Sequence, residues 1–267
     1  MTGAAVDTAQ ALEAAPLSRM LAAQTRATLL HYWRVPVFFV FSMALPVMFY
    51  LFFGLPFAHE KLPDGTSVGT IVMAHMGAYA VSSVLVFNIG IGRANNRAQK
   101  LDLLQRATPL PGWVVIVADA IGAMALALVS LVALFAVAVA GGGVSLTPEG
   151  WLLLPLKLVL GALPLLGLGL AIGYGSGPNA APAICNLIYL PMSFASGLFI
   201  PLQNLPDFIG RIAPYLPTYH YSQLVDHGLA PTRESLGVAV LWLIGWGVVL
   251  LGAAVRAYRA DQSRKFS

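Results

Sequence analysis

Six long apolar segments limit what this chain can fold into. They are residues 35–57, 68–92, 113–140, 151–175, 180–200 and 236–258. A helix needs about 20 mostly apolar residues to cross roughly 30 Å of hydrocarbon at 1.5 Å per residue. The chain is 58% hydrophobic and 10% charged, whereas about 25% of the residues in a soluble domain are charged. We therefore expect an all-α polytopic membrane protein with six transmembrane helices.

The basic residues predict the orientation of these spans. With both termini in the cytoplasm, eleven of the fifteen Lys and Arg residues lie on the cytoplasmic side and three lie in the outer loops. This bias follows the positive-inside rule and requires an even number of spans. We expect one transmembrane domain over residues 1–267, made of a cytoplasmic tail and interface helix (1–34), a six-helix membrane part (35–258) and a second cytoplasmic tail (259–267).

Composition also argues against two other classes of site. The basic residues are scattered between apolar blocks, so they predict topology and no nucleic-acid partner. The single cysteine, Cys185, lies inside an apolar segment. It therefore excludes a disulfide framework, and no Cys/His spacing predicts a metal site.

The segment before the first span, residues 17–36, predicts an amphipathic helix on the inner leaflet, in contact with membrane lipids. Ser18 is in position to cap it, and leucines supply its apolar side. Its polar side carries Arg19, Arg26 and Arg34.

Proline breaks helices, and four prolines interrupt residues 201–217. Broken helix at membrane depth requires burial in protein or a water-filled cavity. We expect the fifth helix to end at Pro201, followed by a short re-entrant helix capped by Asp207, with Tyr219 and Tyr221 as anchors at the interface. A plain extracytoplasmic loop is the alternative.

Several motifs then carry a family resemblance. The stretches are "SGLFIP" (196–201), "IAPYLPTYHY" (212–221), "LPVMFYLFFG" (45–54) and "LLQRATPLPGW" (103–113). In this order, within six spans, they resemble the type-2 ABC exporter permease family over nearly the whole chain. The resemblance implies a permease in a bacterial plasma (inner) membrane that pairs with a second copy, or a close homologue, and with two ATP-binding cassette subunits.

The resemblance also implies export, with ATP hydrolysed on another chain. Apolar spans with few charges favour an amphipathic or lipid-like substrate, such as a drug, an antibiotic, a lipid or a glycan-lipid, although polysaccharide-exporting relatives share this architecture. The chain has no Gly-x-x-x-x-Gly-Lys-Ser/Thr loop, since Gly141–Gly143 is followed by Val144. We therefore expect no cofactor on this chain, with ATP and Mg²⁺ bound by the partner ATPase.

The loop expected at residues 93–111 then becomes the element on which the ATPase acts. A short helix should end before Pro109, because the residue ahead of a proline disfavours helix. The expected coupling residues are Arg97, Lys100, Asp102, Leu103, Leu104, Thr108 and Pro109. Asn96 stands where the family usually has an acidic residue, and a solvated basic loop is the alternative. The resemblance also implies that the amphipathic helix at residues 17–36 packs beside the ATPase, although a simple membrane-surface anchor explains its pattern equally well.

The resemblance also predicts a gate and a substrate path. Two re-entrant segments, one from each permease, would form an apolar lid on the outer side. The gate residues are Gly197, Phe199, Pro201, Leu205, Pro206, Phe208, Pro214 and Pro217. Polar side chains at helical spacing share one face of each helix and are the candidates to line the path. They are His75, Tyr79, Ser82, Asn186, Tyr189 and Ser193. The alternative is that they only form hydrogen bonds between helices.

Two other functions compete with ATP-driven export. Asp119 and Lys157 lie inside spans, where a charge suggests a function, and a carboxylate at that depth would suit a proton-coupled secondary transporter. "GYGSG" (173–177) resembles the Gly-x-Ser-Gly of intramembrane serine proteases. However, the last span contains no histidine to act as base.

Overall fold

The computed structural model describes residues 16–34, 44–63, 65–106 and 108–264, and these residues form helices and turns without a β-strand. Within these ranges, four helices are long and apolar enough to span a membrane. They are Val68–Ala98, Gly112–Gly142, Pro148–Gly175 and Leu236–Ser263. Two apolar helices are shorter, Ala44–Phe57 and Ala181–Ala195. The all-helical membrane architecture is confirmed, and the six-span count stays a prediction because residues 35–43 lie outside the described residues.

The bounds of the principal helices are as follows. They are α1 (Leu17–Arg34), α3 (Val68–Ser83), α4 (Ile89–Ala98), α5 (Leu101–Arg106), α6 (Gly112–Gly142), α7 (Pro148–Gly175), α8 (Ala181–Ala195), α9 (Asp207–Ile212), α10 (Pro217–Asp226) and α11 (Leu236–Arg264). A π-helical turn, Val84–Asn88, joins α3 to α4. Ser18 lies inside the first turn of α1 and is not its cap.

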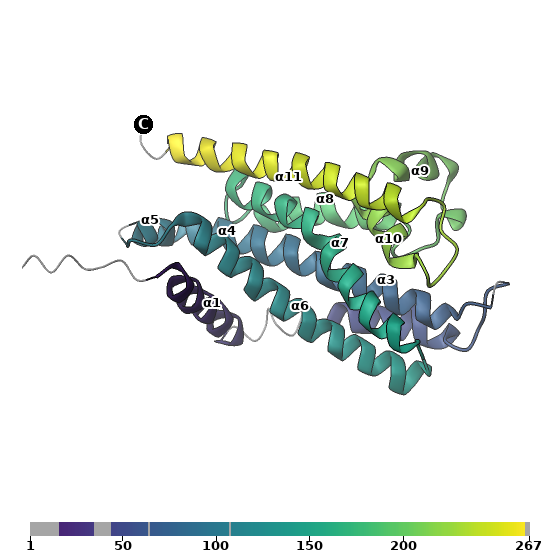
Figure 1. Ribbon diagram of the computed structural model, residues 1–267. Helices are drawn as coiled ribbons and strands as arrows, with labels where there is room; N and C mark the ends of the chain where they lie inside the picture. The colour runs from purple at the N-terminus through teal and green to yellow at the C-terminus, as the bar shows by residue number, and fades with distance from the viewer. Residues whose placement is uncertain (1–15, 35–43, 64, 107, 265–267) are drawn as a thin grey trace, which may run out of the picture.

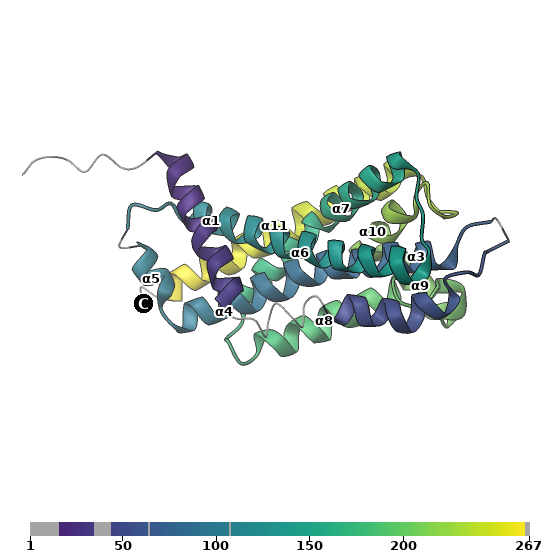
Figure 2. The same cartoon turned by 90° about the horizontal axis from the view of Figure 1, so that it is seen from below.

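The long helices form an elongated bundle (Figures 1 and 2). At one end, here called the α1 end, lie α1, α5 and the C-terminal part of α11. At the opposite end, the α9 end, lie α9 and α10. Helix α7 packs against both α4 and α11, and α6 packs against α1 and α3. Large side chains such as Met73, Leu131 and Leu158 fill the interior.

Two glycines let α7 approach the α3–α4 segment closely. A Cβ atom on Gly169 would lie 2.6 Å from the Leu85 carbonyl oxygen, and one on Gly173 would lie 2.7 Å from Arg93 Cβ. Small residues four apart allow close backbone contact between membrane helices. The Gly169-x-x-x-Gly173 pair therefore sets the distance between α7 and α4.

The expected end of the second span at Gly92 is wrong. The helix continues through α4 to Ala98, so no loop begins at Arg93. A buried ion pair to α6, described below, allows Arg93 to remain in the helix. The chain turns at Lys100, which adopts the left-handed conformation (φ 58°), and α5 follows.

The expected extent of the fifth span, to Ile200, is also wrong. Helix α8 ends at Ala195, because Gly197 adopts a left-handed conformation (φ 86°) that terminates the helix before Pro201. Asp207 lies in the first turn of α9 and makes no capping bond, so its predicted role as a cap is wrong.

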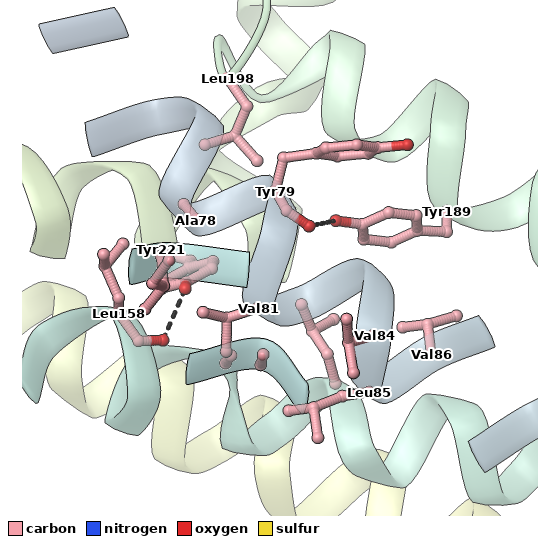
Figure 3. Close-up of a cluster of buried hydrophobic side chains, with 14 of the residues drawn as sticks. Ala78, Tyr79, Val81, Val84, Leu85, Val86, Leu158, Tyr189, Leu198 and Tyr221 are labelled. Atoms are coloured by element: carbon pink, nitrogen blue, oxygen red, sulfur yellow. Dashed lines mark hydrogen bonds between the residues drawn. The ribbon is translucent and has the colours of Figure 1, made fainter. Parts of the chain in front are cut away.

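The expectation that Tyr219 and Tyr221 anchor at the membrane interface is wrong as well. Both lie in α10, whose ten residues are all buried. Tyr221 Oη donates to the Leu158 carbonyl oxygen of α7 at 2.6 Å (Figure 3). The chain after the proline-rich segment thus folds back into the bundle, since α10 finds apolar partners on α7 and α11.

Candidate functional site

Helix α1 is docked on α6 through one buried side chain. Thr28 is the buried residue of α1, and its Oγ1 donates to Asp119 Oδ1 at 3.1 Å. Gly122 makes room for it, since a Cβ atom there would lie 2.6 Å from Thr28 Cγ2. Nearby, burial and then the Asp119 carboxylate raise the pKa of Tyr32, so this phenol remains neutral. The three arginines expected on the polar face, Arg19, Arg26 and Arg34, are exposed.

Asp119 of α6 also holds the end of the long helix Val68–Ala98. Its Oδ2 lies 2.5 Å from Arg93 Nη2 in an ion pair with little exposure on either side. An unpaired charge inside a span is costly. The ion pair with Arg93 accounts for a carboxylate at this depth as a structural contact, without a role in carrying protons.

Arg97, one turn further along α4, joins three helices. Its Nε donates to Asp261 Oδ1 at 2.9 Å, and its Nη1 donates to the carbonyl oxygens of Gly173 (2.9 Å) and Ser176 (3.0 Å). The guanidinium of Arg97 is therefore engaged by partners within this chain. Its predicted role toward an ATPase stays a prediction.

The expected coupling helix is present as α5, which starts directly after Lys100. Asp102 lies in its first turn, and Leu104 is 66% exposed. Thr108 Oγ1 donates to the Gln105 carbonyl oxygen at 2.5 Å, and Pro109 is exposed. Nothing is described of the Leu103 side chain.

A groove of about 460 Å³ separates α1 from the residues that follow α5. It is lined by Arg19, Met20, Ala23 and Gln24 on one side and by residues 108–110 on the other. The two elements predicted to face the ATPase are thus brought together at the α1 end.

Four of the six predicted path residues meet in the interior. Ser82 Oγ lies 2.6 Å from Tyr189 Oη. Tyr189 Oη also donates to the Tyr79 carbonyl oxygen at 3.3 Å (Figure 3). The rings of Tyr79 and Tyr189 stack at 5.8 Å, and Ser193 Oγ donates to the Tyr189 carbonyl oxygen at 2.8 Å. The Tyr189 hydroxyl thus bonds from α8 to α3, whereas Ser193 bonds within α8, so these polar groups find partners inside the protein.

The other two path residues lie apart. His75 Nε2 lies 2.7 Å from Asp226 Oδ1 of α10. Asn186 is exposed on α8, where its side chain donates to the Pro182 carbonyl oxygen. Lys157, the other charge noted inside a span, donates to the His227 carbonyl oxygen.

The gate residues divide between buried and exposed positions. The ring centroid of Phe199 lies 4.8 Å from that of Tyr79 and 4.5 Å from that of Phe194. Phe208 on α9, in contrast, is 62% exposed. Gly197 and Pro217 are buried. Leu205 is partly exposed, and Pro201, Pro206 and Pro214 are exposed.

A family model for the ABC-2 type transporter matches residues 20–229, from α1 through α10. The chain belongs to the ABC-2 type transporter family. A protein of Bacillus subtilis (strain 168) named "Putative transport permease YvfS" is 26% identical over 229 residues, which cover 84% of this chain and 93% of that protein. The family resemblance noted in the sequence is therefore confirmed.

Membership of the ABC-2 family determines the general role of this integral membrane protein. Proteins of the family are transmembrane subunits of ABC transporters, which are not themselves the catalytic ATPase and which work with ATP-binding cassette subunits. The serine of the "GYGSG" stretch has a structural explanation in this setting, because Ser176 Oγ donates to the Ile172 carbonyl oxygen at 2.6 Å.

Sequence reasoning missed several residues that organise the α1 end. Thr28 was not distinguished from its neighbours, and Asp261 lies in what was expected to be a tail. Arg93 was assigned to a loop on the basis of its charge. The Gly169-x-x-x-Gly173 spacing is the one signal that would have indicated the close packing of α7.

Proposed function

We propose that this chain is the permease of an ATP-driven exporter in a bacterial plasma membrane, with both termini in the cytoplasm. It pairs with a second permease copy and with two ATP-binding cassette subunits, which carry ATP and Mg²⁺. The cargo is an amphipathic or lipid-like molecule, since the spans are apolar and the few charges inside them are paired.

The groove at the α1 end is the observation that carries this proposal. Helix α1 and residues 108–110 line it together, and α5 presents Leu104 beside it with 66% of its surface exposed. Contact of this exposed leucine with a protein partner would remove its apolar surface from water, which is favourable. We assign this surface, from α1 to residue 110, to the ATPase.

Two arginines provide a route from this surface to the spans. Helix α5 is connected to α4 by one turn, and α4 is tied to α6 through Arg93 and to α7 and α11 through Arg97. A displacement of α5 would therefore act on several helices as a rigid-body movement, in keeping with how packed helices transmit motion.

The α9 end provides the proposed gate. Phe208, Ile212 and Tyr215 are each at least half exposed in the single chain. An apolar set of this kind requires lipid or a protein partner. We propose that the α9 segments of two copies form the outer lid and that the path runs beside α3 and α8, where Asn186 is exposed.

A charged residue in place of Leu104 tests the coupling surface. In Leu104→Glu, we expect the permease to insert and fold normally but to lose stimulation of its ATPase and export, because the docking anchor becomes charged. Leu62→Glu, an exposed leucine before α3, is the matched control and should behave as wild type. Unchanged ATPase stimulation in Leu104→Glu would remove the assigned role of α5.

The partner and the cargo are tested together. Purification with an ATP-binding cassette subunit from the same organism should give a complex whose ATP hydrolysis rises with particular lipids or drugs. Binding of nucleotide by the isolated permease would contradict the division of labour.

A further inference from the structure

A cavity lies beneath α1, next to the groove at residues 108–110, with which it shares Gln24 in its lining. It has a volume of about 490 Å³ and is lined by parts of α1, α4, α5 and α6 and by the π-helical turn before α4. This size falls within the roughly 300–1,000 Å³ typical of small-ligand clefts.

Asn88 makes this cavity more than a packing gap. It is 5% exposed and lines the cavity, yet neither its Oδ1 nor its Nδ2 has a hydrogen-bond partner among the described residues. An unsatisfied buried amide costs about 1–3 kcal/mol. Asn88 also ends the π-helical turn Val84–Asn88, and such turns are frequent at functional sites.

The charges of the lining cancel. Arg93 and Asp119 are its only Lys, Arg, Asp or Glu side chains within the described chain, and they are paired with each other at 2.5 Å. Arg93 Nε has no hydrogen-bond partner among the described residues, so one donor remains available. A cavity without net charge does not compensate the desolvation of an ionic ligand.

The remaining lining is rich in groups that both donate and accept. Side-chain amides surround the ion pair, from Gln24, Asn88, Asn95, Asn96, Gln99 and Gln105. Each amide offers two donors and an acceptor, which matches a hydroxyl group that donates and accepts at once.

We propose that this cavity binds a neutral, hydroxyl-rich headgroup, with sugar as the chemical class, and that Asn88 supplies its deepest contacts. Helix α1 lies over it, so a sugar attached to a lipid can enter while its chains remain in the inner leaflet. This proposal goes beyond transport, and its test needs neither ATPase nor export.

The test measures lipid binding to the permease in nanodiscs by native mass spectrometry. The probe is a monoglucosyl diacylglycerol, compared with phosphatidylglycerol of the same chains and with free glucose. We expect the glucosyl lipid to be retained over phosphatidylglycerol, and Asn88→Leu to weaken its binding about tenfold, from the loss of one or two hydrogen bonds. Asn179→Leu, an exposed asparagine in the turn before α8 and outside the cavity lining, is the matched control and should bind as wild type.

The remaining outcomes separate the sources of the ligand. Asn88-dependent binding of free glucose would support the same chemistry with a soluble sugar as its source. Equal binding of the glucosyl lipid by wild type and Asn88→Leu, or a preference for phosphatidylglycerol, would overturn the proposal. If Asn88→Leu fails to fold, Gln105→Leu on α5, which is partly exposed at the same cavity, replaces it with the same expected direction.

Discussion

Arg97 and Asp261 join the long helix Val68–Ala98 to the last one, α11. Arg97 Nε donates to Asp261 Oδ1 at 2.9 Å, although the two residues lie 164 positions apart in the sequence. The same guanidinium also donates to the Gly173 and Ser176 carbonyl oxygens at the end of α7. A side chain next to the proposed coupling helix thus holds three helices at the α1 end.

We expect Arg97→Ala to lower the free energy of unfolding by about 1.5–3 kcal/mol, because it leaves the Asp261 carboxylate buried without this partner. Thermal unfolding in detergent measures the loss. Arg259→Ala, an exposed arginine on the same helix as Asp261, should have little effect.

A second substitution checks that the two residues act as a pair. Adding Asp261→Ala to Arg97→Ala should cost much less than Asp261→Ala alone, since the partner is already gone. Strictly additive losses would show that the contact contributes nothing to stability.

Gly122→Ala should loosen α1 from α6. The added Cβ would lie 2.6 Å from Thr28 Cγ2, and overpacking of this kind costs about 1–3 kcal/mol. Thr28→Ser removes that methyl group but keeps the hydroxyl that donates to Asp119. We therefore expect Thr28→Ser to restore the melting temperature of Gly122→Ala.

The control glycine for this experiment is Gly252 on α11, where an added Cβ meets nothing within 4 Å. Gly252→Ala should be neutral or slightly stabilising, because alanine favours helix. A stable Gly122→Ala protein, or no rescue by Thr28→Ser, would contradict the docking of α1 through this contact.

Tyr189→Phe separates a structural role from a substrate contact. Tyr189 Oη lies 2.6 Å from Ser82 Oγ, and hydrogen bonds between membrane helices contribute about 0.6 kcal/mol on average. We expect a small loss of thermal stability and an unchanged substrate concentration for half-maximal ATPase stimulation. A severalfold shift in that concentration, at constant stability, would instead place Tyr189 on the path.

Phe208→Cys, in a protein carrying Cys185→Ser, reports on the gate. Phe208 is 62% exposed in the single chain, so only lipid or a second copy can protect it. In membranes we expect slow reaction with an impermeant thiol reagent, compared with Lys61→Cys in the exposed turn before α3. Fast labelling at both positions would show an ordinary loop and remove the lid.

Much of the fold follows from the sequence because hydropathy acts locally. Apolar segments of sufficient length predict membrane helices wherever the chain later packs them, and the described helices Val68–Ala98, Gly112–Gly142, Pro148–Gly175 and Leu236–Ser263 each contain most of an expected span, although the first and last of them extend beyond it. The amphipathic helix α1 and the short helix α5 were also predicted from their own residues. The family was indicated by sequence motifs, which can be recognised without knowledge of the tertiary contacts.

The sequence alone therefore determined that this protein is a helical membrane permease of the ABC-2 family, and approximately where its helices run. Tertiary structure alone decided which polar residues remain inside. The sequence predicted a loop position for Arg93, whereas the structure pairs it with Asp119 on α6. The sequence predicted an interface anchor at Tyr221, whereas the structure buries it against Leu158 of α7. The physical reason is that the cost of burying a charge or hydroxyl depends on its partner, and that partner is supplied by a distant part of the chain.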